Sequence, residues 1–316
     1  MAILISANAG WDRQLWVDKI AELDPARDVI ADDASPRLGE VRYALVWKAP
    51  QVLLGRLPKL DVIFNLGAGV DAILADTTIP PHIPIVRIVD DNLTHRMSEW
   101  IALQVLIHHR QTLVYQERQR AGIWEDQPGQ PAAAHVTVGI MGLGELGRDA
   151  ARVLAALGFR LVGWSRTRRE VPGVTTFAGD SGLDAFLAET DILVCLLPLT
   201  PETTGILDRR LFSKLKRGGP LGGPFLVNAG RGLEQKEADI LAALADGTLR
   251  GASLDVFEEE PLPASSPLWR HPRVIVTPHN AADSEPDSLT RYILAQIAAH
   301  EAGKPLQNVV DRKRGY

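Results

Sequence analysis

The stretch 138–159, "VGIMGLGELGRDAARVLAALGF", decides the fold of this 316-residue chain. An apolar run typical of a buried strand leads into the spacing G-x-G-x-x-G, and an amphipathic helical segment follows. In that context Gly142 would permit a tight turn, Gly144 would let the backbone approach a pyrophosphate, and Gly147 would let helix and strand pack closely. The spacing alone is a weak signal, but its position between strand and helix predicts a dinucleotide-binding unit.

Alternating apolar runs and amphipathic segments surround this unit. Four strands are expected before it and six from its own strand onward, within 2–7, 43–49, 61–69, 83–89, 135–142, 160–165, 191–198, 224–230, 251–256 and 273–278. This rhythm predicts an α/β protein with two doubly wound parallel-sheet domains. The helical stretch 289–305 has no strand after it, so it can return to the first domain. We therefore expect a Rossmann NAD(P)-binding domain, 98–283, inserted in a discontinuous flavodoxin-like domain, 1–97 and 284–316.

A long helix is expected from Met97 to Gly122, and its apolar residues cover much of its circumference. Such a helix packs on two sides, as a connector between domains or in a subunit contact. The segment 125–134 that follows is rich in Pro, Gly and Gln, which predicts a loop.

Composition argues against several classes of partner. The net charge of −5 disfavours nucleic acid and anionic membrane surfaces, because both attract basic patches. No apolar run reaches the roughly 18 residues of a membrane span, and the first residues do not resemble a signal peptide. With Cys195 as its one cysteine, the chain can form neither an internal disulfide nor a cysteine-based metal site. We expect no metal and a reducing, cytoplasmic location.

The end of the expected strand 160–165 bears on the choice of cofactor. An NAD-binding unit commonly carries a carboxylate about 20 residues after the glycine turn, where it accepts hydrogen bonds from the ribose hydroxyls. Here Ser165 takes that place, and Arg166, Arg168 and Arg169 follow. Because a hydroxyl and guanidinium groups suit a 2′-phosphate, we expect NADP(H), with NAD(H) as the alternative cofactor. The other interpretation is a solvated basic turn.

Polar groups follow three expected strands at the sheet edge where doubly wound folds bind ligands. Arg231 follows 224–230, an acidic cluster follows 251–256, and His279 follows 273–278. His271 precedes its strand, which predicts the opposite edge. An arginine fork binds a carboxylate, and a histidine beside a carboxylate can give and take a proton near neutral pH. The set suits hydride transfer to or from a 2-oxo or 2-hydroxy acid, for which the protein supplies one proton.

The chain resembles the D-isomer-specific 2-hydroxyacid dehydrogenase family over almost its whole length. The segments GLGELG, LPLTPETTGIL, NAGRG, LDVFEEEPLP, VTPHNAA and VVDRKRGY occur in the family's order. By position, Arg231 matches the arginine that binds and polarises the substrate, His279 matches the proton donor, and Glu260 matches the carboxylate that orients that histidine. Glu258 and Glu259 are expected to face water. VWKAP and RIVDDNLTHRMSEW are similar to the glyoxylate/hydroxypyruvate reductase A branch.

The resemblance implies NADPH-dependent reduction of glyoxylate, hydroxypyruvate or another small 2-oxo acid, with substrate entering between the domains. It also implies a homodimer, with Trp124 reaching the partner. The substrate-binding residues that it implies are Trp47, Ala68, Gly69, Arg231 and His279. The cofactor-binding residues are Gly142, Leu143, Gly144, Glu145, Leu146, Gly147, Ser165, Arg166, Arg168, Leu197, Pro198, Ala229, Gly230, Asp255 and Ala281.

Other interpretations stay open. Trp47 could be a core residue, and 67–69 could be a simple strand-to-helix turn. Oxidation of another 2-hydroxy acid or of phosphite is a second activity, whereas formate oxidation is disfavoured because formate dehydrogenases of the family carry glutamine in place of Glu260. A non-catalytic NAD(P)-sensing module, as in the family's transcriptional corepressors, is a third. Two segments depart from the family pattern: 216–225, KRGGPLGGPF, is unusually long, and 232–239, GLEQKEAD, replaces a GGVVDEDAL-like run.

Overall fold

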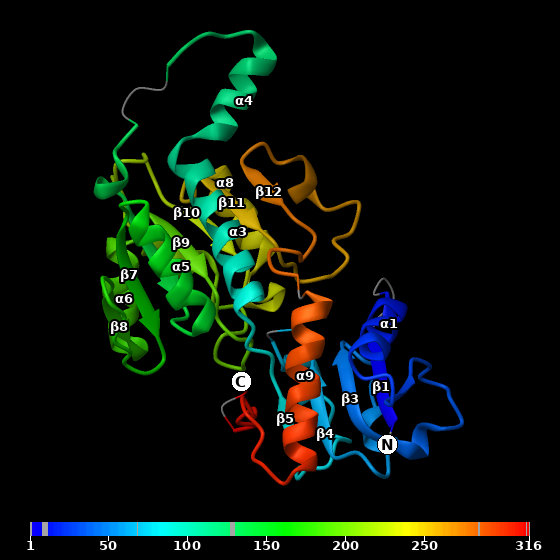
Figure 1. The fold of residues 1–316 in the computed structure, drawn as a ribbon. Coiled ribbons are helices and arrows are strands. Elements are labelled where there is room, and N and C mark those ends of the chain that lie inside the picture. Colours follow the sequence, from blue (N-terminus) through cyan, green and yellow to red (C-terminus); the bar gives the residue numbers. More distant parts are fainter. Residues whose placement is uncertain are drawn as a thin grey trace. The chain divides into compact units, whose positions relative to one another are not determined.

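The chain divides into two compact units in the computed structural model, which describes residues 2–7, 12–67, 69–126, 130–283, 285–313 and 315. Unit 1 comprises Met1–Leu93 and Asp283–Tyr316, and unit 2 comprises Thr94–Ala282 (Figure 1). The chain passes from unit 1 to unit 2 four residues before the expected bound 97, and it returns one residue before the expected bound 283. The first passage lies inside a continuous helix, α3 (Asp91–His109), whose Met97 already packs in a core of unit 2.

Unit 1 holds a five-stranded parallel sheet in the order β2-β1-β3-β4-β5. This is the flavodoxin-like order, as expected. The strand β2 is the one that the sequence pattern does not predict. The elements are β1 (Ala2–Ala7), α1 (Arg13–Leu23), β2 (Asp28–Ile30), η1 (Leu38–Glu40), β3 (Val41–Trp47), η2 (Leu54–Arg56), β4 (Val62–Asn65), α2 (Asp71–Leu74), β5 (Ile85–Val86) and α9 (Pro286–Glu301).

The last helix, α9, packs on the sheet of unit 1 beside α1 (Figure 1). Leu289, Ile293 and Ile297 are fully buried at a spacing of four, which places them on one helical stripe. They share a core cluster with Trp16 and Ile20 of α1 and with strand residues of β1, β3 and β4. The expectation that the end of the chain returns to the first domain is therefore confirmed.

Unit 2 holds a seven-stranded parallel sheet in the order β12-β11-β10-β9-β6-β7-β8. The six expected strands are present, and β8 is an additional edge strand. The elements after α3 are α4 (Thr112–Ala121), η3 (Ala133–His135), β6 (Thr137–Met141), α5 (Glu145–Ala156), β7 (Arg160–Ser165), β8 (Thr175–Ala178), α6 (Gly179–Glu189), β9 (Ile192–Cys195), α7 (Arg209–Ser213), β10 (Phe225–Asn228), η4 (Gly232–Glu234), α8 (Glu237–Ala245), β11 (Gly251–Leu254), η5 (Pro267–Arg270) and β12 (Val274–Val276).

The expectation of one helix from Met97 to Gly122 is wrong. The helix α3 ends at His109, and Gln111 adopts a φ of 53°, in the left-handed region that interrupts a right-handed helix. A second helix, α4, begins at Thr112 and has no buried residue. The loop expected over 125–134 falls partly on residues 127–129, which lie outside the described residues.

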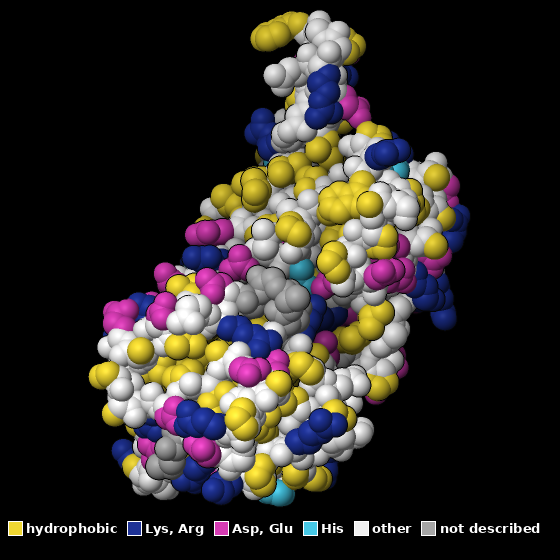
Figure 2. Space-filling model, turned by 90° about the vertical axis from the view of Figure 1, so that its right-hand side faces the viewer, with side chains coloured by type: hydrophobic (Ala, Val, Ile, Leu, Met, Phe, Trp, Pro, Cys, Tyr) yellow, Lys and Arg dark blue, Asp and Glu magenta, His cyan; other side chains and the backbone are white. Residues whose placement is uncertain are grey.

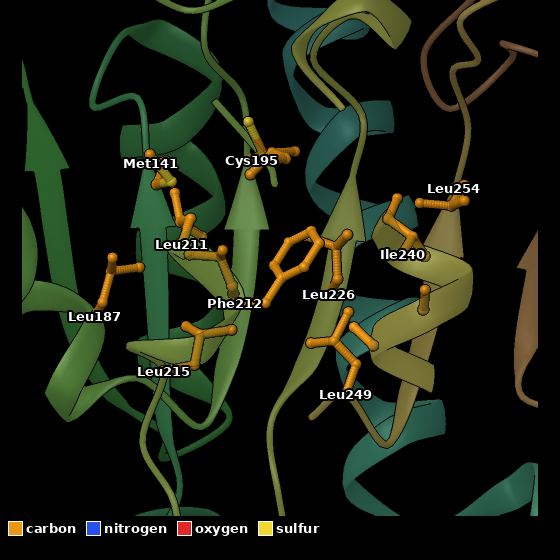
Figure 3. Close-up of a cluster of buried hydrophobic side chains, with 14 of the residues drawn as sticks. Met141, Leu187, Cys195, Leu211, Phe212, Leu215, Leu226, Ile240, Leu249 and Leu254 are labelled. Carbon is orange, nitrogen blue, oxygen red and sulfur yellow. The ribbon is translucent and has the colours of Figure 1, made fainter. Parts of the chain in front are cut away.

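Two cores cover the two faces of the large sheet because alternate strand residues point to opposite sides. On one face α3 and α5 pack over residues such as Ile140, Val194 and Val227. The helices α6, α7 and α8 pack over the other face, where Figure 3 shows Leu211 and Phe212 of α7 beside the strands. The strand residues that Figure 3 labels on this face are Met141, Cys195, Leu226 and Leu254. A sheet buried on both faces gives the rigid base for the loops at its edge.

The unusual segment 216–225 closes around a buried carboxylate at the amino edge of the sheet. Asp191, 2% exposed, accepts hydrogen bonds from Lys216 Nζ at 3.0 Å and from the Thr137 backbone N–H at 2.9 Å. A Cβ at Gly219 would lie 2.1 Å from Asp191 Oδ1, so the backbone approaches the ion pair closely. The segment thus lies at the edge opposite to the predicted catalytic groups.

Candidate active site

The predicted catalytic and cofactor residues of unit 2 follow strands whose carboxyl ends lie at one sheet edge. Backbone hydrogen bonds continue past the strand ends there, from Leu196 to Met141, from Ala229 to Cys195 and from Asp255 to Asn228. The topological switch lies between β6 and β9, the place where such sheets form a ligand crevice. Arg231, Glu260 and His279 follow the neighbouring strands β10, β11 and β12.

The glycine turn after β6 has the geometry that its sequence predicts. Gly142 has a φ of 102°, and a Cβ there would lie 2.5 Å from the Leu196 carbonyl oxygen. A Cβ at Gly147 would lie 1.9 Å from the Gly142 carbonyl oxygen, so the helix packs on the turn itself. A Cβ added at Gly144, the N-cap of α5, would meet no atom of the described residues within 4 Å. The helix N-terminus therefore has room for an anion.

The other predicted cofactor residues line the same edge. Leu143, Leu197, Ala229 and Ala281 are buried, while Glu145 is exposed in the first turn of α5 and forms an ion pair with Arg148. Leu146 packs partly buried against the α5 core, and the Pro198 carbonyl accepts a hydrogen bond from Thr203 Oγ1 at 2.8 Å. The Gly230 N–H donates to Asn228 Oδ1 at 3.0 Å. Their contacts with a cofactor remain predictions.

Ser165 ends β7, and its side chain contacts the backbone of the turn that follows. The side chain is 7% exposed, and its hydroxyl donates to the Thr167 carbonyl at 2.8 Å. Arg166 and Arg168 are exposed on either side of Thr167. Ser165 thus orders a tight turn that presents two guanidinium groups, and the residue that ends this strand carries a hydroxyl in place of a carboxylate.

The pairing of Glu260 with His279 is present in the structure. Glu260 Oε2 lies 2.8 Å from His279 Nδ1, and the two side chains are 21% and 25% exposed. Because an ionised carboxylate only accepts hydrogen bonds, Nδ1 carries the proton of this contact and Nε2 is the atom left for proton transfer. Glu260 Oε1 accepts the Phe257 backbone N–H at 3.2 Å, which fixes the carboxylate. Glu258 and Glu259 are exposed, as expected.

His271 differs from His279 in position and surroundings. It follows η5 and precedes β12, as expected, and its Nδ1 accepts the Arg273 backbone N–H at 3.2 Å. Burial and the nearby Arg273 charge lower the pKa of His271. It lies at the amino end of the strand whose carboxyl end carries His279.

Asp255 fastens the loop that carries His279. The side chain is 2% exposed; Oδ1 accepts from Thr277 Oγ1 at 2.6 Å and from the Asn280 N–H at 3.0 Å, and Oδ2 accepts the Ala281 N–H at 3.0 Å. His279 itself has a φ of 53°, and its N–H donates to the Asp255 carbonyl at 2.8 Å. The structure thus gives Asp255 a role in loop geometry, and its predicted cofactor contact remains a prediction.

Arg231 follows β10 in extended backbone and is partly buried. Its guanidinium NH1 donates to the Gly230 carbonyl at 2.8 Å, and its backbone N–H donates to Glu234 Oε2 at 3.0 Å. An arginine fixed by its own backbone keeps its planar fork in one direction, which suits recognition of a carboxylate.

In unit 1, Asn65 orders the loop after β4. Its Nδ2 donates to the carbonyls of Gly67 at 2.6 Å and of Gly69 at 2.7 Å, and the residue is 2% exposed. Trp47 is half-buried and lies so close that a Cβ at Gly67 would meet its ring at 1.9 Å. Ala68 lies outside the described residues. Asn65 is not among the residues that the sequence motifs predict for the site, although a polar residue that ends a buried apolar strand is a usable signal.

Two kinds of site are absent from the described part of the chain. No group of His, Cys, Asp and Glu side chains there could hold a metal ion. None of the helices described is both long and apolar enough for a membrane crossing.

Comparison with known proteins places the chain in a family. The model described as "D-isomer specific 2-hydroxyacid dehydrogenase, NAD binding domain" matches residues 102–281. The glyoxylate/hydroxypyruvate reductase A of Yersinia enterocolitica is 42% identical over 280 residues, which cover 87% of each chain. The crystal structure of the NADPH-dependent glyoxylate/hydroxypyruvate reductase of Sinorhizobium meliloti with NADP and sulfate gives a TM-score of 0.93 at 48% identity, covering 100% of this chain and 99% of that one.

A second solved structure agrees. The D-isomer specific 2-hydroxyacid dehydrogenase of Xanthobacter autotrophicus Py2, in complex with NADPH and MES, gives a TM-score of 0.91 at 40% identity and covers 100% of this chain and 99% of that one. The match of the family model over more than half of the chain agrees with the strand order, the glycine turn and the Glu260–His279 pair. The chain belongs to the D-isomer specific 2-hydroxyacid dehydrogenase family.

Proposed function

We propose that the chain reduces glyoxylate, hydroxypyruvate or a similarly small 2-oxo acid to the 2-hydroxy acid, with NADPH as the hydride donor. The observation that carries the proposal is the 2.8 Å contact of Glu260 with His279 Nδ1, at the sheet edge that also carries Arg231 and the glycine turn. Relatives named glyoxylate/hydroxypyruvate reductase A support the substrate class, and the NADP and NADPH complexes of similar structures support the cofactor.

The residues of unit 2 fit a bound dinucleotide. The turn from Gly142 to Gly147 leaves the N-terminus of α5 open for a pyrophosphate, and Arg166 and Arg168 are exposed for a 2′-phosphate. When bound, the reduced nicotinamide supplies the hydride. The chain's own groups must then hold the substrate and provide one proton.

Through its guanidinium fork, Arg231 would bind the substrate carboxylate and polarise the oxygen of the 2-oxo group. His279 would donate its Nε2 proton to that oxygen as the carbonyl carbon gains the hydride, and the neutral imidazole would regain a proton from solvent. Glu260, bonded to Nδ1, would hold the ring and stabilise its protonated form before transfer. From unit 1, Trp47, Ala68 and Gly69 remain the proposed substrate contacts, with Asn65 ordering the last of these.

A panel of 2-oxo acids assayed with NADPH and with NADH tests this function. We expect turnover with glyoxylate and hydroxypyruvate, and higher catalytic efficiency with NADPH. NADPH binding without turnover of any panel member would instead favour a nucleotide-sensing module. Oxidation of phosphite in a parallel assay would identify the alternative dehydrogenase.

Introducing a carboxylate at residue 165 is expected to change the cofactor preference. Ser165→Asp should lower catalytic efficiency with NADPH relative to NADH by about 100-fold, because the carboxylate repels a 2′-phosphate and accepts hydrogen bonds from ribose hydroxyls. Ser165→Ala is the matched control, since it removes the hydroxyl that donates to Thr167 without adding charge. If the ratio of catalytic efficiency with NADPH to that with NADH is the same in Ser165→Asp and in the parent protein, Ser165 does not lie at the 2′-phosphate site.

We also propose that the chain forms a homodimer through an arm composed of α4 and residues 122–126. Trp124 is 103% exposed and Ile123 52% exposed, and Leu103 on α3 is 54% exposed. Figure 2 shows apolar side chains at the tip of this arm and around its base. Large apolar side chains that are exposed to this extent favour burial against a second copy. The single cysteine, Cys195, is free, and a chain without an internal disulfide fits the proposed cytoplasmic location.

Charge at the arm tip should break the dimer. Trp124→Asp is expected to shift the mass measured by light scattering after size-exclusion chromatography from dimer to monomer at micromolar concentration. Leu15→Asp, an exposed apolar residue of α1 at 47% exposure, is the control and should leave the mass unchanged. A dimer that survives Trp124→Asp would rule out the arm as its main contact.

A further inference from the structure

The segment 232–239, which departs from the family pattern, begins directly after Arg231. It buries two successive polar side chains. Glu234 and Gln235 are 0% and 1% exposed, whereas the preceding Leu233 is 51% exposed. This inverts the usual arrangement, in which leucine is buried and glutamate faces water. A buried carboxyl group is costly unless hydrogen bonds hold it, so its partners indicate what it does.

The Glu234 carboxylate contacts the backbone on both sides of the peptide bond between residues 230 and 231. Its Oε2 accepts the Arg231 N–H at 3.0 Å, and a Cβ at Gly230 would lie 2.3 Å from the same oxygen. The Cys195 thiol donates to Oε2 at 3.4 Å from the sheet side. Burial, reinforced by the Glu234 charge, raises the pKa of that thiol, so it stays protonated and keeps donating.

The same peptide group holds the guanidinium of Arg231. Its carbonyl, that of Gly230, accepts NH1 of the Arg231 side chain at 2.8 Å, while its N–H donates to Glu234. Turning this peptide would move the acceptor that fixes the guanidinium. The direction of the arginine fork therefore depends on the carboxylate that holds the N–H side.

Gln235 supports Gly230 through Asn228, and it also contacts the backbone next to the residue that binds Glu260. Its Oε1 accepts Asn228 Nδ2 at 2.9 Å, and Asn228 Oδ1 accepts the Gly230 N–H at 3.0 Å. Its Nε2 donates to the Val256 carbonyl at 2.9 Å, next to Phe257, whose N–H donates to Glu260. The backbone N–H of Gly230 therefore donates to Asn228, and the backbone N–H of Arg231 donates to Glu234, both of which are buried residues.

We propose that Glu234 is a positioning residue for Arg231, which aims the guanidinium at the substrate carboxylate by holding the peptide between residues 230 and 231. Gln235 completes the support through Asn228. The proposal rests on the proposed substrate role of Arg231. It assigns a function to a segment whose composition is otherwise unexplained.

Removing the Glu234 carboxylate should weaken substrate binding and turnover and leave cofactor binding intact. Glu234→Leu is expected to raise KM for the 2-oxo acid and lower kcat/KM by about 10- to 100-fold, while Kd for NADPH, measured by fluorescence, changes less than about twofold. Glu234→Gln keeps an acceptor oxygen without the charge and should stay within about threefold of the parent kcat/KM. Equal losses in the two variants would overturn the positioning role.

A control separates this effect from general loss of stability. Thr190 is also fully buried in unit 2, and its hydroxyl donates to the Phe186 carbonyl at 2.8 Å. Thr190→Val should lower the unfolding midpoint without raising KM. In an Arg231→Ala background, Glu234→Leu should cause no further loss of kcat/KM, because the group through which it acts is gone. A full additional loss there would refute the proposal.

Amide hydrogen exchange of residues 229–236, followed by mass spectrometry, tests the inference without catalysis. Exchange in this peptide should be at least about tenfold faster in Glu234→Leu than in the parent protein, Glu234→Gln or Thr190→Val. Unchanged exchange in Glu234→Leu would overturn the proposal. If the parent protein reduces no 2-oxo acid, the proposed function fails, but this measurement still decides whether Glu234 holds the Arg231 backbone.

Discussion

Replacing His279 with alanine is expected to lower kcat for the 2-oxo acid by about 10³-fold, within the range of general acid catalysis. The variant lacks the Nε2 proton that the product oxygen must receive, together with the imidazole that Glu260 holds through Nδ1. Because the glycine turn and Ser165 lie on other strands, Kd for NADPH should stay within about twofold. Single-turnover and steady-state kinetics with glyoxylate, together with NADPH fluorescence titration, make the comparison.

Two further variants sharpen this test. Glu260→Gln keeps a side chain of the same shape but removes the charge that stabilises the protonated imidazole, so kcat should fall by about 10- to 100-fold. His271→Ala changes the histidine at the amino end of the same strand and should leave kcat unchanged. Turnover of His279→Ala close to that of the parent protein would remove His279 from the mechanism.

Most of the fold could be predicted because buried parallel strands are apolar runs, which are visible without knowledge of the structure. The two missed strands are edge strands with weak patterns. β2 is three residues long, and β8 carries two threonines and no fully buried residue. The break between α3 and α4 has no Pro or Gly to mark it, since Gln111 takes the left-handed conformation instead.

The predicted catalytic groups could be placed at one sheet edge because the position of a residue after its strand determines which edge it reaches. Contacts between polar side chains that are distant in the sequence could not be predicted, because they depend on geometry that no local pattern encodes. Glu234 illustrates the difference: its carboxylate reaches back to Arg231 and across to Cys195. The available signal was an acid and an amide in a run where the family resemblance leads one to expect apolar residues.

Asp255 offers the second large effect, because one buried carboxylate holds the whole His279 loop. Asp255→Ala is expected to lower kcat by about 100-fold and the free energy of unfolding by about 3 kcal/mol. The substitution removes the acceptor of the Asn280 and Ala281 backbone N–H groups. His279 has a φ of 53°, which costs a non-glycine residue about 1–3 kcal/mol and persists only where neighbours enforce it. Without the carboxylate the backbone can relax and carry the imidazole away from Glu260.

Kinetics and binding distinguish this positioning role from the predicted cofactor contact of Asp255. A positioning role lowers kcat with little change in Kd for NADPH, whereas a cofactor contact raises Kd for NADPH. Thr277→Val removes only the donor that lies 2.6 Å from Asp255 Oδ1, so kcat should stay within about threefold and stability should fall by about 1 kcal/mol. If Asp255→Ala unfolds more easily but keeps the parent kcat, the strained His279 backbone is held by its own N–H bond to the Asp255 carbonyl, which the substitution leaves in place.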